Sequence, residues 1–263
     1  MSGLFAKTVR DQRRALIGWG LGLAAIALMY AAFYPSIKDS ASDFDKYLQN
    51  LPDAIRNVIG GDFTTPAGYL RSETFSSMGP VLFLVFAIGA GARAIAGEEE
   101  DGTLDLLLST PIRRRQLLVD KIGAMVLTAT ALATVLFLTL WLVGPPFDLT
   151  VPAVDLGAAC LLLLLLGLAF GAIALAIGCA TGHRGLALGL TGGFAVFAFI
   201  VNALAPSVDA LAWLRPLSPF RWYLDPDPLV SGITPANVLV LLGIAVAGYL
   251  VAWYAFERRD LAA

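Results

Sequence analysis

Six long apolar runs dominate this sequence and limit what it can fold into. Each has roughly 20 residues or more, the length that a helix needs to cross a hydrocarbon core about 30 Å thick. The chain of 263 residues is 58% hydrophobic and only 14% charged, whereas soluble domains carry about 25% charged residues. This composition excludes a soluble enzyme and a disordered chain. The runs cover about residues 15–34, 77–96, 117–143, 154–180, 185–204 and 238–256.

The apolar runs predict helices rather than the strands of a barrel. A segment inside a bilayer must satisfy its backbone hydrogen bonds within a helix or a closed barrel. Barrel strands alternate apolar and polar residues, whereas residues 161–166 are an unbroken run of leucine. The sequence therefore predicts an all-α polytopic membrane protein with six transmembrane helices. Residues 1–263 form one membrane domain, because no loop is long enough for a separate soluble one.

Charge and cysteine usage exclude further classes. The net charge is −2, which gives no general affinity for nucleic acid. The chain has a single histidine, His183, and two cysteines, Cys160 and Cys179, in the same apolar run. On one helix these cysteines would lie about 28 Å apart, far beyond disulfide reach. We therefore expect no internal disulfide and no metal site built from Cys and His.

The distribution of Lys and Arg predicts the orientation in the membrane. With the N-terminus inside, 12 of the 18 basic residues lie on the cytoplasmic side and 6 on the outer side. Short loops rich in Lys and Arg stay in the cytoplasm. Both termini are therefore expected in the cytoplasm. The expected cytoplasmic residues are Lys7, Arg10, Arg13, Arg14, Arg93, Arg113, Arg114, Arg115, Lys121, Arg184, Arg258 and Arg259.

The segments around the first span carry their own signals. In residues 1–14 apolar and basic residues alternate, which predicts a short amphipathic helix on the membrane surface; the alternative is a basic anchor without defined structure. Residues 44–59 carry an apolar stripe at helical spacing, stopped by Gly60 and Gly61. Thr65 and Pro66 then predict a helix start. This outer segment forms either a packed cap over the bundle or, with a functional role, an outer gate or a substrate rim.

The loop between the second and third runs is the most informative segment. Four successive acids end the second run, and a short leucine-rich stretch follows them. Ser109, Thr110 and Pro111 predict a helix stop and a new start. We expect a short surface helix whose leucines rest on the underside of the bundle or on a partner protein. The residues concerned are Glu98, Glu99, Glu100, Gly102, Thr103, Leu104, Asp105, Leu106, Leu107, Leu108 and Ser109.

This loop resembles the signature of ABC-type permeases of the second export class. The shared pattern is an acidic cluster, Gly-Thr-Leu, an acid among leucines, a Thr-Pro turn, and then basic residues with Lys121. Residues 64–70, 218–223 and 227–229 also look like this family, so the likeness covers nearly the whole chain.

The resemblance implies a transmembrane subunit of an exporter in a prokaryotic plasma membrane. Its short cytoplasmic coupling helix, about residues 102–109, would contact a separate ATPase that carries ATP and Mg²⁺, with Leu104, Leu106 and Leu107 inserted into the ATPase. The working unit would hold a second permease subunit, identical or related. A lesser contact would come from the second inner turn, which comprises Thr181, Gly182, His183 and Arg184.

The sequence independently indicates that the ATPase lies on another chain, because it lacks a phosphate-binding loop. A phosphate-binding loop has the form G-x-x-x-x-G-K-[ST]. The four lysines follow Ala6, Ile37, Asp45 and Asp120, and none follows glycine. This chain is therefore expected to bind no ATP in that way and no other cofactor.

Several features have a plainer interpretation beside the functional one. The glutamates form either a solvated charge run or a gating and ATPase contact. The arginines of 113–115 also suit anionic lipid. Gly185, Gly189 and Gly193 share one helix face, which permits a close approach between subunits or packing inside one subunit. Gly18 and Gly22 share a face in the same way.

Three rival functions stay open at this point. A similar complex can serve metalloenzyme maturation or self-immunity rather than export of an apolar or amphipathic substrate. A membrane enzyme such as a lipid transferase would need polar residues that converge at one membrane face. An ATP-independent carrier would be expected to show charged groups within the spans or a repeat, and the sequence has no clear repeat.

Overall fold

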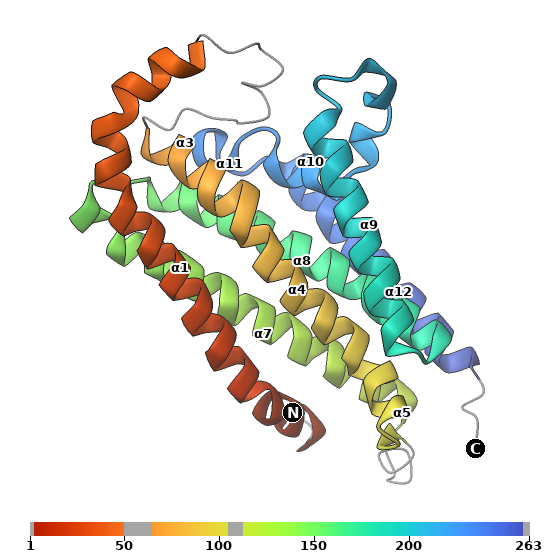
Figure 1. The fold of residues 1–263 in the computed structure, drawn as a ribbon. Helices are drawn as coiled ribbons and strands as arrows, with labels where there is room; N and C mark the ends of the chain where they lie inside the picture. The colour runs from red at the N-terminus through yellow and green to blue at the C-terminus, as the bar shows by residue number, and fades with distance from the viewer. Residues whose placement is uncertain (1–2, 50–64, 105–112, 260–263) are drawn as a thin grey trace.

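The protein is a bundle of long helices (Figure 1). The computed structural model describes residues 3–49, 65–104 and 113–259, and within these ranges it contains helices and no strand. Six helical stretches are long and apolar enough to cross a membrane, which confirms the predicted number and class. These candidate spans are Arg13–Ser40, Pro66–Glu100, Arg114–Val143, Ala153–Thr181, Arg184–Leu204 and Pro235–Arg258.

The first helix is longer than its apolar run. α1 extends without a break over Gly3–Gln49, so residues 1–14 do not form the separate short helix that the sequence predicted. The reason is local, because no glycine or proline lies between residues 4 and 17 to end a helix. Pro35 is accommodated inside the same helix. Residues 50–64, which hold the predicted stop at Gly60 and Gly61, lie outside the described residues.

The second span is assembled from five consecutive helical segments. Thr65 caps it as predicted, since its hydroxyl accepts a hydrogen bond from Gly68 N at 3.2 Å, and Pro66 opens the first turn. Gly79 N donates to Thr74 O in a wider π-helical turn, and a Cβ at Gly79 would lie 2.3 Å from that oxygen. The segments are α3 (Pro66–Leu70), η1 (Arg71–Met78), α4 (Gly79–Ala92), η2 (Arg93–Gly97) and α5 (Glu98–Glu100).

The third to sixth spans complete the bundle around one central helix. α8 is the most buried of the spans and packs against α4, α7, α9 and α12. A Cβ added at Gly248 of α12 would lie 2.8 Å from the Cβ of Ala172, so this glycine permits close packing against α8. α1 packs mainly along α7 at one side of the bundle (Figure 1). The remaining spans are α7 (Arg114–Val143), α8 (Ala153–Thr181), α9 (Arg184–Leu204) and α12 (Pro235–Arg258).

Short helices cover the end of the bundle that holds Tyr69 and Tyr223, here called the aromatic end. The buried hydroxyl of Tyr223 donates to Phe75 O at 2.8 Å, and Ser218 Oγ donates to Ala198 O at 2.8 Å. The segment between the fifth and sixth spans is broken into four of these short helices. The short helices are η3 (Pro145–Phe147), η4 (Asp209–Leu211), η5 (Arg215–Leu217), α10 (Pro219–Leu224) and α11 (Pro228–Ser231).

Candidate functional site at the acidic end of the bundle

The opposite end of the bundle, here called the acidic end, is built where the second span stops. Glu98, Glu99 and Glu100 form the last helical turn, and Gly102 then reverses the chain with φ +65°. Thr103 folds back onto that turn: its N–H donates to Glu98 O at 2.8 Å, and its hydroxyl donates to the same carbonyl at 3.1 Å and to the Glu98 carboxylate. The start of the signature loop is therefore fixed against the helix that precedes it.

Glu98 joins the end of the second span to the third. Its carboxylate forms an ion pair with Lys121 of α7, whose side chain lies inside the bundle with only 7% of the residue exposed. A buried ammonium without a partner is strongly unfavourable, whereas a paired and hydrogen-bonded one is tolerated. The pair therefore fixes the first turns of α7 against α5.

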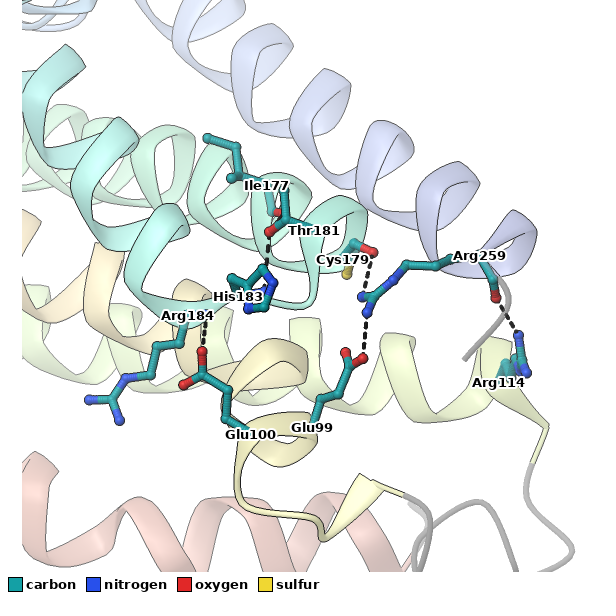
Figure 2. Close-up of polar contacts among 9 residues, drawn as sticks. All are labelled: Glu99, Glu100, Arg114, Ile177, Cys179, Thr181, His183, Arg184 and Arg259. Carbon is teal, nitrogen blue, oxygen red and sulfur yellow. Dashed lines mark hydrogen bonds and ion pairs between the residues drawn. The ribbon is translucent and has the colours of Figure 1, made fainter. Parts of the chain in front are cut away.

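Glu99 reaches the opposite side of the cluster. It forms an ion pair with Arg259, the residue that follows α12, as Figure 2 shows. The same guanidinium donates to Cys179 O at 3.3 Å near the end of α8, and Arg114 donates to Arg259 O at 3.1 Å. These contacts join the ends of α5, α8 and α12 to the start of α7.

Glu100 holds the start of the fifth span. Its Oε1 accepts a hydrogen bond from the backbone N–H of Arg184 at 2.9 Å (Figure 2). Arg184 is the first residue of α9, where a carboxylate is favoured because the helix dipole is positive at that end. The acidic cluster and the second inner turn, which the sequence singled out separately, are thus in direct contact.

The second inner turn is itself a constrained structure. Gly182 has φ +71°, and His183 N donates to Thr181 Oγ1 at 3.2 Å. A Cβ at Gly182 would lie 2.1 Å from Nη2 of Arg259, so only glycine fits here without displacing that guanidinium. His183 is exposed and is the N-cap residue of α9.

These contacts bear on the first of the two interpretations of the glutamates, a solvated charge run. Each of the three is bonded to a different part of the same chain, so they are not a freely solvated charge run. Lys121 and Arg259 were not predicted as parts of the site. For Lys121 the signal in the sequence was its place in the family-like pattern of the loop. For Arg259 it was only the position of a basic residue directly after an apolar run.

Leu104 is buried inside the bundle. We expected it to insert into an ATPase, but it is only 2% exposed and packs in a cluster with Leu117, Leu118 and Phe256. The leucines were expected to pack either on the underside of the bundle or on a partner protein, and Leu104 packs on the bundle. Residues 105–112, which hold Asp105, Leu106, Leu107, Leu108 and Ser109, lie outside the described residues.

The glycine face of α9 is bare in the described structure. A Cβ built on Gly185, Gly189 or Gly193 meets no atom within 4 Å. Packing of this face inside one subunit is therefore excluded for the described residues. Its neighbours on the helix surface include exposed apolar side chains such as Leu190 and Phe197.

The fold and the acidic end together define a class. Within the described residues, an all-helical bundle with six candidate spans carries a partly buried polar cluster just before a Gly-Thr-Leu segment. The family model for the ABC-2 family transporter protein matches residues 3–261. The chain belongs to this family, which confirms the resemblance, and such membrane permeases lack ATPase activity of their own. No match to the chain was found among the curated proteins.

Proposed function

We propose that this chain is the membrane subunit of an ATP-driven exporter and is coupled to a separate ATPase through residues 102–109. The observation that carries the proposal is the acidic cluster. Three consecutive glutamates, directly before that segment, are bonded to α7, to Arg259 and to the start of α9. A displacement of the segment is therefore passed to three further spans at once.

The coupling works through a difference between two states of the bundle. ATP and Mg²⁺ on the partner close the ATPase pair, and this motion pulls on residues 102–109. The pull shifts the bundle only if its two arrangements bind the ATPase with different affinity. In the described arrangement, the glutamate contacts hold the inner ends of the spans together, and we infer that the other arrangement loosens some of them.

We place the acidic end in the cytoplasm of a prokaryotic cell. Arg114, Arg115, Arg184, Arg258 and Arg259 all lie at this end, at or directly beyond the ends of the spans. Basic residues at span ends are enriched on the cytoplasmic side. The ATPase is then on the side where ATP is available.

We place the translocation path beside α4 and α9, between two copies of the subunit. An apolar groove of about 240 Å³ lies between these helices and is lined by Val81 and Val85 of α4 and by Val196 and Phe199 of α9. The bare glycine face of α9 lies next to it and admits a second copy. A path with such walls suits an apolar or amphipathic substrate.

The partner is tested by co-purification from native membranes. The tagged chain should bring down an ATPase with a phosphate-binding loop, detected by mass spectrometry. The double variant Leu106→Asp/Leu107→Asp should insert into the membrane normally but lose the ATPase. The matched control is Val208→Asp/Leu217→Asp, which introduces the same charges at exposed apolar positions of the aromatic end and should retain it. Retention of the ATPase by the first variant would contradict the assignment of the coupling segment.

A further inference from the structure

A groove between α1 and α4 has no role in the proposed coupling. It has a volume of about 320 Å³ and is lined by one face of α1 from Ala15 to Ile26 and by Leu82 of α4. Trp19 contacts Phe86 across the groove, edge to face, with ring centroids 6.1 Å apart. The lining is almost entirely apolar, so an occupant must offer an apolar surface.

The two glycines of α1 lie in this groove and leave it unfilled. A Cβ built on Gly18 or on Gly22 meets no atom within 4 Å. These glycines therefore do not permit a close approach of α1 to another described helix. They widen the space beside Trp19.

The length of the groove matches one leaflet of a bilayer. Ala15 and Ile26 are 11 residues apart, which is about 16 Å along a helix. Half of a hydrocarbon core about 30 Å thick is about 15 Å. A groove of this length accommodates one acyl chain of one leaflet.

Two arginines lie at similar distances beyond one end of the groove. Arg14 precedes Gly18 by one helical turn on α1, and Arg93 follows Phe86 by two turns on the second span. Measured along the helices from the Trp19–Phe86 contact, they lie about 8 Å and about 11 Å toward the acidic end. Both charges thus lie just beyond the apolar lining of the groove.

Neither arginine is neutralised by an acid of the described chain. Both side chains are exposed, and Arg93 Nε donates only to the carbonyl of Gly89 one turn before it. No ion pair with a described carboxylate is present for either residue. Arginine so close to the apolar core needs an anionic partner or water.

We propose that this groove binds one anionic phospholipid of the leaflet at the acidic end. An acyl chain lies along Gly18, Trp19 and Gly22, and the phosphate lies between Arg14 and Arg93. The lipid joins α1, which packs mainly on α7, to α4. The proposal is independent of the ATPase and of the transported substrate.

Quenching of Trp19 fluorescence tests the site directly. A variant with Trp141, Trp213, Trp222 and Trp253 replaced by Phe is reconstituted in vesicles of mixed phosphatidylglycerol and phosphatidylcholine, with bromine on the acyl chains of one lipid at a time. Brominated phosphatidylglycerol should quench Trp19 with about fivefold preference over brominated phosphatidylcholine. Arg14→Gln/Arg93→Gln should reduce the preference to about one. Arg13→Gln removes the adjacent charge on α1, which lies about 100° around the helix from Arg14 and outside the residues that line the groove, and should preserve the preference.

The occupancy of the groove is tested with a bulky side chain. Gly22→Leu should reduce quenching by both brominated lipids, whereas Gly243→Leu, at a glycine of α12 that also meets no atom, should not. Equal quenching by the two lipids in the parent, or an unchanged preference in the double arginine variant, would overturn the proposal.

Native mass spectrometry of the chain with all its tryptophans gives a second measurement. The detergent-purified protein should carry a phosphatidylglycerol adduct that Arg14→Gln/Arg93→Gln loses and Arg13→Gln retains. An adduct of equal occupancy in all three proteins would rule the site out.

Discussion

The carboxylate of Glu99 and the guanidinium of Arg259 form an ion pair across 160 residues of sequence. Through it, the residue that follows the last span is bound to the last turn of the second. The guanidinium also bonds Cys179 O, so the pair closes a polar contact between α5, α8 and α12 (Figure 2). The end of α12 therefore contacts the helical turn that lies just before the coupling segment.

Removing Arg259 should destabilise the bundle more than removing an exposed arginine. The side chains of Arg259 and Glu99 are only 21% and 25% exposed. Arg259→Gln leaves a partly buried carboxylate without its partner, at a cost of about 1–3 kcal/mol. Arg115→Gln, whose own pair with Glu257 leaves the arginine 65% exposed, should cost less than about 1 kcal/mol. Thermal unfolding in detergent measures both, and equal losses would contradict the structural role of Arg259.

The turn at Gly182 should not tolerate a side chain. Gly182→Ala places a Cβ in a left-handed backbone conformation, at a cost of about 1–2 kcal/mol, and against the guanidinium of Arg259. Gly243→Ala is the matched control, since it lies within α12 in open space and should stabilise the helix by about 0.5–1 kcal/mol. The two substitutions should therefore move the melting temperature in opposite directions.

The bare face of α9 gives a prediction about assembly. A Cβ at Gly189 meets no described atom within 4 Å, so Gly189→Leu should leave the free energy of unfolding of the monomer unchanged or slightly raised. If a second copy packs on this face, the bulky side chain should lower the dimer fraction measured by light scattering in detergent. A normal dimer fraction would show that the two copies meet elsewhere.

The orientation can be measured with cysteines at the two ends. Thr150→Cys and His183→Cys both create exposed thiols, whereas the natural Cys160 and Cys179 are buried and give little background. An impermeant maleimide added to intact cells should label position 150 and not position 183. Labelling in the reverse pattern would place the acidic end outside and remove the basis for an ATPase contact there.

We expect the folded protein to lose stability at alkaline pH because of Tyr223 at the aromatic end. Complete burial raises the pKa of Tyr223 well above its usual value of 10.0, because the ionised phenolate would lose its hydration. Its folded pKa exceeds the unfolded one, so this contribution to stability is complete below about pH 10 and is lost as the pH rises beyond it. Tyr223→Phe should remove this part of the alkaline destabilisation in unfolding measured against pH. It should also cost about 1 kcal/mol at neutral pH through the lost bond to Phe75 O.

The sequence predicted those features that depend on local composition. Apolar runs of sufficient length indicated six spans, and Thr65 with Pro66 marked a helix start, because both signals depend on adjacent residues alone. The continuation of α1 was not predicted, since a change from apolar to basic residues was interpreted as a boundary although nothing in residues 4–17 breaks a helix.

The candidate site was only partly predictable for a related reason. The glutamates were recognisable as a cluster, but their partners come from α7, α9 and the end of α12. Pairing of this kind depends on tertiary packing, and the spacing of apolar residues along the sequence does not indicate which helices are in contact. Leu104 was assigned to a partner protein for the same reason, because its burial under α7 and α12 is not visible in a leucine-rich pattern.

The central claim is that this chain transmits the work of a separate ATPase through residues 102–109. The most direct measurement is ATP hydrolysis by the complex co-purified from native membranes, compared with the chain isolated alone and with the Leu106→Asp/Leu107→Asp variant. We predict hydrolysis in the complex, none by the isolated chain, and none in material purified through the variant. Hydrolysis by the isolated chain, or undiminished hydrolysis with the variant, would contradict the account.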